Sequence, residues 1–339
     1  MSRIQYNKVI QKTAGEELLL NLVRLKYREQ VSFLQVGSVS AQFVFEGAAD
    51  ITGTLREDVG LSRGNPNMLE IGGGVGYTER PTITYSPLSG QDFAERVLSP
   101  INLKIIALLI DSGWRIDRVL RLTVGDINGL DNAGTASGPT PKIAPSYREF
   151  LRAIKLLRAL QKDKRLHFHY EDRHQDISDP IPASLMTADA VVKSAEAGTR
   201  FRLTSDRESY VLTRDKLMLF LRFDDTVESE YADELRALLN LSPALMEFEL
   251  ASADRVKGGG TDESGHLTQV AMDTRSLLGA MFYLSQGIEA PEAHAEANLV
   301  TTTLNPDGTP FDWKQVVGEL MTVHSQRTRP RHAAVAVKH

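Results

Sequence analysis

A two-residue alternation of non-polar and polar residues across residues 38–86 constrains the fold more than any other feature of this sequence. The odd-numbered positions from Val39 to Leu55 are all non-polar, and most even-numbered positions between them are polar. The same alternation returns from Leu69 to Tyr85, after a turn region at 60–66 that contains Gly and Pro. Successive residues of a strand point to opposite faces, so each run predicts a β-strand. Two such runs around a turn predict one long antiparallel hairpin over residues 37–86.

The apolar face of this hairpin is the first candidate functional surface. Its predicted members are Val39, Phe43, Phe45, Ile51, Leu55, Leu69, Ile71, Val75, Tyr77, Ile83 and Tyr85. Two runs of roughly 17 to 19 residues would each span about 55 to 60 Å, whereas an average strand has about 5 or 6 residues. Either bulges divide these strands, or the strands project from the body. Glycines at 72–74 and 76 favour bends, and Pro81 favours a sheet edge or a bulge because it has no amide donor.

Two interpretations of the apolar face lead to different functions. The plainer one is that helices of the same chain cover it. The other is an oligomeric sheet or β-barrel to which each subunit adds two strands, because alternating strands suit a membrane barrel and one hairpin cannot close alone. Glu79 and the many Gly and Ala residues on the face count against contact with lipid. An uncovered face of this size would have to meet lipid or another subunit.

The rest of the chain mixes helices and strands without regular β-α-β spacing, which indicates an α+β fold with an antiparallel sheet. We expect helices at 8–29, 91–112 with a break at Pro100, 147–162, 186–195, 228–239, 274–286 and 311–324. We expect strands at 119–127, 165–170, near 201 and 210, and at 246–251, 267–272 and 333–337.

Chain length and a change of composition predict the domain organisation. A chain of 339 residues exceeds the roughly 250 residues that a single core usually serves, so we expect an internal boundary. The stretch 131–143 is rich in Gly, Ser, Thr and Pro and is predicted to be a linker. It would separate an N-terminal unit at 1–130 from an α+β unit at 144–339, which could divide again near 256–266.

Composition excludes several classes of protein. Hydrophobic residues at 42% and charged residues at 24% are values of a globular chain, and no apolar run approaches the roughly 18 residues of a membrane helix. The net charge of −5, with no extended basic stripe, argues against nucleic acid as a partner. The absence of cysteine excludes disulfides and thiolate metal sites and fits either the cytoplasm or the periplasm. We expect no cofactor.

No recognisable catalytic motif occurs, so we expect a protein that is not an enzyme. The glycine-rich segment 71–76 lacks the following Lys-Ser/Thr and helix of a phosphate-binding loop. His167, His169 and Glu171 would share one face of a regular strand, a spacing that could bind a divalent metal ion. Alternating polar residues on a solvated strand explain the same pattern. The alternative function is therefore a soluble metal-dependent enzyme or ligand-binding module around these three residues.

Four segments carry a resemblance to a known group of proteins. Residues 18–28, 81–88, 275–286 and 310–313 resemble a family of uncharacterised bacterial proteins, many with lipoprotein-type export signals. The resemblance spans nearly the whole chain and implies a location more than a chemistry. It implies the cell envelope, on the periplasmic side of the outer membrane, with the cytoplasm as the alternative. Members of the family continue beyond 333–337 with an aromatic, acidic segment, which implies that this chain is a fragment.

The hairpin, the lack of a catalytic motif and the resemblance together predict a function. We expect a structural or assembly protein of the bacterial cell envelope that self-associates or docks into a larger complex through its hairpin. The expected partners are further copies of the chain or an envelope complex, with outer-membrane contact through the hairpin.

Overall fold

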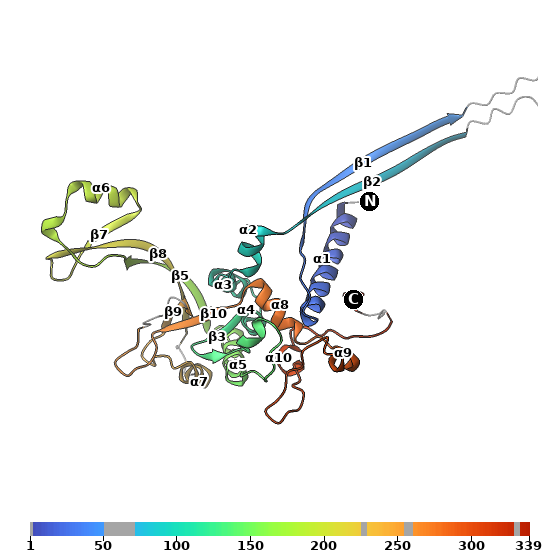
Figure 1. The fold of residues 1–339 in the computed structure, drawn as a ribbon. Helices are drawn as coiled ribbons and strands as arrows, with labels where there is room; N and C mark the ends of the chain where they lie inside the picture. The colour runs from blue at the N-terminus through green and yellow to red at the C-terminus, as the bar shows by residue number, and fades with distance from the viewer. Residues whose placement is uncertain (1–2, 51–71, 225–228, 254–259, 329–332) are drawn as a thin grey trace, which may run out of the picture.

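The structure is a computed structural model, and it describes residues 3–50, 72–224, 229–253, 260–328 and 333–339. Helices and an eight-stranded sheet form the body, and a two-stranded ribbon extends away from it (Figure 1). This arrangement confirms the α+β class.

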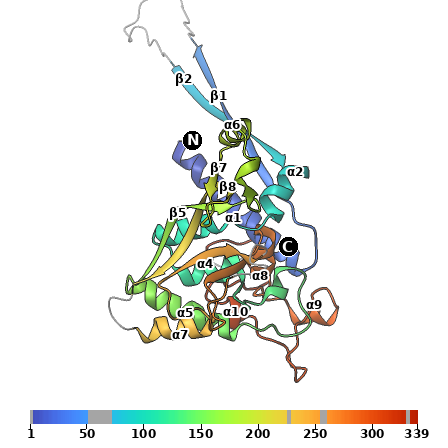
Figure 2. The ribbon, with the colours of Figure 1, turned by 90° about the vertical axis from the view of Figure 1, so that its left-hand side faces the viewer.

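The ribbon is the expected hairpin. Strand β1 (Leu34–Asp50) pairs antiparallel with β2 (Gly72–Pro87), and among the described strands these two pair only with each other. Helix α1 (Arg3–Lys26) lies beside the base of the ribbon, and neither Figure 1 nor Figure 2 shows a described helix over its outer half. The interpretation that helices of the same chain cover the hairpin therefore fails for this part.

The main sheet forms the centre of the body in the strand order β4-β3-β10-β9-β8-β5. Its strands are β3 (Val124–Ile127), β4 (Leu130–Asp131), β5 (Leu166–Asp176), β8 (Ser209–Phe223), β9 (Glu247–Ser252) and β10 (Gln269–Thr274). Neighbours are antiparallel except β9 and β10, which run parallel and correct the expectation of a purely antiparallel sheet.

Four helices cover one face of this sheet and build the largest core. They are α3 (Leu103–Asp111), α4 (Ile116–Thr123), α5 (Arg148–Lys162) and α7 (Glu230–Leu238). The buried alternate residues Leu219, Leu221 and Phe223 of β8 pack in the same cluster as Phe150 and Leu235 of the helices. The opposite face carries polar residues of β5 and β9, among them His169, Glu171 and Glu247, around the buried Phe220 of β8.

A second arm, in addition to the ribbon, extends from the body where β5 and the first half of β8 continue beyond it as a pair (Figure 1). Strands β6 (Ile181–Pro182) and β7 (Thr199–Leu203) pair with β8 there, and η3 (Ala183–Leu185) and α6 (Ala188–Glu196) complete the arm.

Smaller clusters attach the remaining elements. Leu22 and Leu25 of α1 pack with Met281 of α8 (Leu277–Ser285), which fixes the helix that precedes the ribbon. Trp313 and Val317 pack with Tyr283 in another cluster beside α10 (Lys314–Val317). The other short helices are α2 (Gly90–Phe93), η1 (Ala94–Leu98), η2 (Gly134–Ser137) and α9 (Glu292–Glu296).

Three secondary-structure predictions need correction. Helix α4 occupies most of the expected strand 119–127, because the buried residues Ile116, Val119, Leu120 and Thr123 repeat at helical spacing. The expected helix 311–324 is reduced to α10, and Val323 instead forms a parallel bridge to Ile288. Residues 333–337 form no strand.

The hydrophobic core continues across the expected linker at 131–143. Asn132, Ala133 and Ala136 are fully buried, and one hydrophobic cluster contains residues from Ile106 to Met272 on both sides of the segment. Gly-, Ser- and Pro-rich composition describes a packed turn as well as a linker.

Candidate functional site

The register of the hairpin places the apolar positions of its two strands on one face. Val39 pairs with Ile83, Phe45 with Tyr77 and Gly47 with Val75, so odd-numbered residues oppose odd-numbered residues from Val39 to Ala49. Directly opposed residues of an antiparallel pair share a face of the sheet. Phe43 lies on this face opposite Glu79. The candidates Ile51, Leu55, Leu69 and Ile71 lie outside the described residues.

A β-bulge at the base extends the apolar face toward the body. Val36 pairs with Tyr85 and Ser38 with Thr84, so Gly37 is the extra residue. Such a bulge bends a strand and shifts its face by one position. Even-numbered Val36 thereby joins the apolar face, which the alternation in the sequence did not predict. At the base, the Leu34 and Tyr85 side chains are 49% and 43% exposed.

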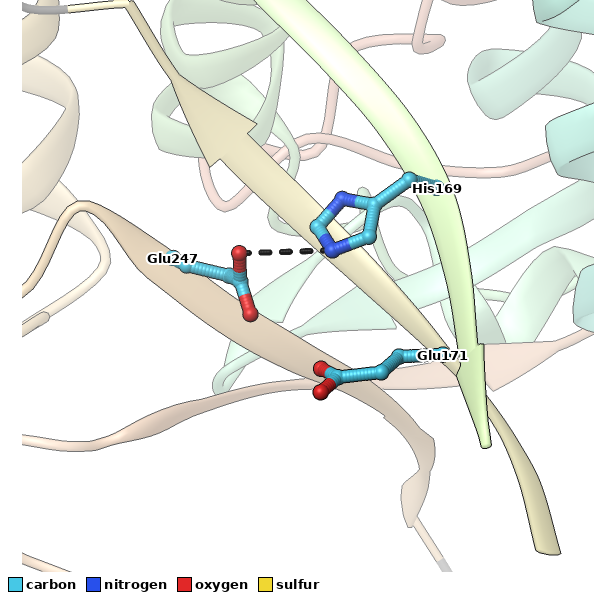
Figure 3. A group of neighbouring side chains, drawn as sticks. All are labelled: His169, Glu171 and Glu247. Atoms are coloured by element: carbon cyan, nitrogen blue, oxygen red, sulfur yellow. Dashed lines mark ion pairs between the residues drawn. The ribbon is translucent and has the colours of Figure 1, made fainter. Parts of the chain in front are cut away.

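The open face of the main sheet holds the second candidate site. His169 and Glu171 project from β5, and Glu247 projects from the start of β9, two strands away (Figure 3). Their ligand atoms all lie within 4.8 Å of one another. His169 Nε2 lies 3.3 Å from Glu247 Oε2. Figure 3 shows the three side chains converging above the sheet.

Arg173 joins this group and offsets part of its negative charge. Its Nη2 donates to Glu171 Oε2 at 2.9 Å and to Glu247 Oε1 at 3.3 Å. The guanidinium carbon lies 4.2 Å from the centroid of the Phe220 ring, on which His169 also stacks. The guanidinium therefore bonds to both carboxylates that would act as ligands of a metal ion. We call His169, Glu171, Arg173 and Glu247 the ionic group.

The predicted metal triad is only partly assembled. The structure brings His169 and Glu171 together, but among the described residues the third member of the cluster is Glu247 and not His167. His167 lies at the exposed start of β5 opposite Arg222. Glu247 could not be found by spacing, because it comes from a distant part of the chain. Arg173 was detectable, since it continues the odd-numbered alternation of β5.

One histidine and two carboxylates fit a divalent ion in residue type, and three protein ligands leave a position open. The side chains are 28% to 47% exposed, so the group lies on the surface and not in an enclosed pocket. A separate open pocket of about 370 Å³ lies at Asp131, Thr135 and residues 141–146, and none of the ionic group lines it. Metal binding at the ionic group stays a prediction.

The segment around Arg275, part of the family resemblance, forms a buried polar junction. The Arg275 guanidinium donates to the carbonyl oxygens of Arg121, Val124 and Asn132 and stacks on Tyr283 at 4.1 Å. Burial lowers the pKa of Arg275 to about 10 and raises the pKa of Tyr283. These groups are bonded to the backbone of their own chain, which is the arrangement of a structural junction.

Comparisons with protein families, with characterised proteins and with solved structures find no match to this chain. The resemblance to an envelope family therefore remains an expectation from the sequence. Among the helices of the described residues, none combines the length and apolar character needed to cross a lipid bilayer.

Proposed function

We propose that this chain is a non-enzymatic assembly protein of the bacterial cell envelope, and that it self-associates or docks into a larger complex through its hairpin. The observation that carries the proposal is the ribbon of β1 and β2, which extends from the body with its apolar positions on one face (Figures 1 and 2). A two-stranded ribbon alone is marginally stable in water. A partner that adds strands to the ribbon or covers its apolar face would stabilise it. The envelope setting rests on the resemblance of the four sequence segments.

The mass of the protein in buffer and in mild detergent, with liposome co-sedimentation, tests this function. We expect oligomers or liposome binding in the wild type. The double variant Phe43→Ser/Phe45→Ser should weaken association at least tenfold, since burying each Phe is worth about 1.5 to 3 kcal/mol.

The matched control is Val44→Ser, which changes the opposite face of the same strand and should leave association unchanged. A wild-type chain that is a strict monomer in both solvents and does not bind liposomes would overturn the proposal. If Val44→Ser weakens association as much as Phe43→Ser/Phe45→Ser does, the apolar face is not the contact surface.

A further inference from the structure

The backbone pattern at the base of the hairpin determines which amides of β2 point away from β1. Leu88 N donates to Phe33 O at 2.9 Å, so residue 88 bonds toward the partner strand. Inward and outward bonding alternate along an antiparallel strand. The extra residue of the bulge is on β1, so β2 keeps this alternation. Even-numbered residues of β2 therefore bond inward, and odd-numbered ones, Pro81 included, face the outer edge.

The outer edge of β2 is poorly suited to receive another strand. Proline has no amide hydrogen, so the edge lacks a donor at Pro81. Glu79 and Arg80 add charges of both signs directly before it. Proline and charged residues are the features that protect sheet edges from pairing with other chains.

The outer edge of β1 has neither proline nor charged residues in the segment that pairs with this part of β2. Residues 38–45 contain no charge and no proline and are rich in β-forming side chains. Ala41, Gln42 and Phe43 stand opposite Pro81, Arg80 and Glu79. By contrast, β5, the long edge strand of the main sheet, carries Glu171, Asp172 and Arg173 in succession.

We propose that β1 of a second copy of this chain pairs with β1 across a two-fold axis, forming a four-stranded sheet in the order β2-β1-β1′-β2′. This inference rests on the proposed self-association and specifies its partner and geometry. The unprotected edge is the same in every copy, so like edges meet. The protected β2 edges then lie outside, and the assembly closes as a dimer.

Charge selects the antiparallel orientation. The acidic residues of β1 are Glu46 and Asp50, both toward its outer end. A parallel pair in register would set each beside its own copy, and like charges directly opposed destabilise a sheet. An antiparallel pair centred within residues 38–45 separates them to opposite ends. A two-fold axis gives this orientation and an isologous contact.

Single cysteines test the arrangement, because the natural chain has none. Cysteine is introduced at one position of β1 at a time, from Ser38 to Phe45. The matched controls are the register partners on β2, from Thr84 to Tyr77. Only the residue on a two-fold axis stands opposite its own copy, and opposed residues lie about 4.5 to 5.5 Å apart, within the range of a disulfide. Under mild oxidation, we expect dimers linked at a single β1 position and at none of the β2 positions.

A backbone variant gives an independent readout. Ala41→Pro removes an outward amide of β1 and leaves the inward ladder in place, so we expect a monomer with an unchanged melting temperature. Glu79→Pro removes an outward amide of β2, and this variant should remain a dimer. A chain that associates but links through β2, or ignores Ala41→Pro, would overturn this inference and leave the proposed function standing. A monomeric wild type would overturn both.

Discussion

At the residue scale, Lys26 shows how a buried charge sets a pH dependence. The residue ends α1 and is 7% exposed, and its Nζ donates to Gln286 O at 3.3 Å. Burial lowers its pKa from 10.5 to about 8. The unfolded chain therefore binds this proton more tightly than the folded protein does, and the charged form opposes folding below pH 8.

We expect the free energy of unfolding to rise between pH 8 and pH 10.5 through the Lys26 contribution. The gain is at most about 3 to 4 kcal/mol, at roughly 1.4 kcal/mol per unit of pKa difference. Lys26→Met should be more stable than the wild type at pH 7, and the difference should shrink as the pH rises through this window. Urea unfolding at several pH values measures it. A constant difference would contradict this account.

At the scale of elements, the ionic group across β5, β8 and β9 shows what local pattern predicts. His169 and Glu171 are two residues apart, so their shared face follows from strand periodicity alone. Glu247 joins them only because β8 lies between β5 and β9, and sheet order is a property of the whole fold. The hairpin was predictable for the same local reason, whereas the burial of Asn132 and Ala136 was not. Composition alone cannot distinguish a packed turn from a linker.

Arg173 should keep zinc out of the ionic group. We expect excess zinc to leave the melting temperature of the wild type unchanged, because the guanidinium bonds to both carboxylates. Arg173→Ala frees them, and zinc at about 100 times its dissociation constant would then stabilise the fold by about 2.7 kcal/mol. The double variant Arg173→Ala/Glu247→Gln should lose this effect. Stabilisation of the wild type by zinc that disappears in Glu247→Gln would instead support the metal-dependent alternative.

At the scale of the whole molecule, the hairpin extends away from the body (Figures 1 and 2). The three hydrophobic clusters of buried residues contain no member of β1 or β2 among the described side chains. The body should therefore fold without the ribbon. Gln35 and Ser86 are paired at the base, and residue 86 bonds inward by the alternation of β2, so a two-residue turn can connect them.

We expect a variant in which Asn-Gly replaces residues 36–85 to keep the cooperative unfolding and melting temperature of the full chain. Its radius of gyration in X-ray scattering should fall toward the value for a compact chain, which is about 20 Å even for 339 residues. It should also be monomeric, because the deletion removes both the outer edge of β1 and the apolar face. Retained association would place the contact on the body or the second arm, and loss of cooperative unfolding would show that the ribbon stabilises the body.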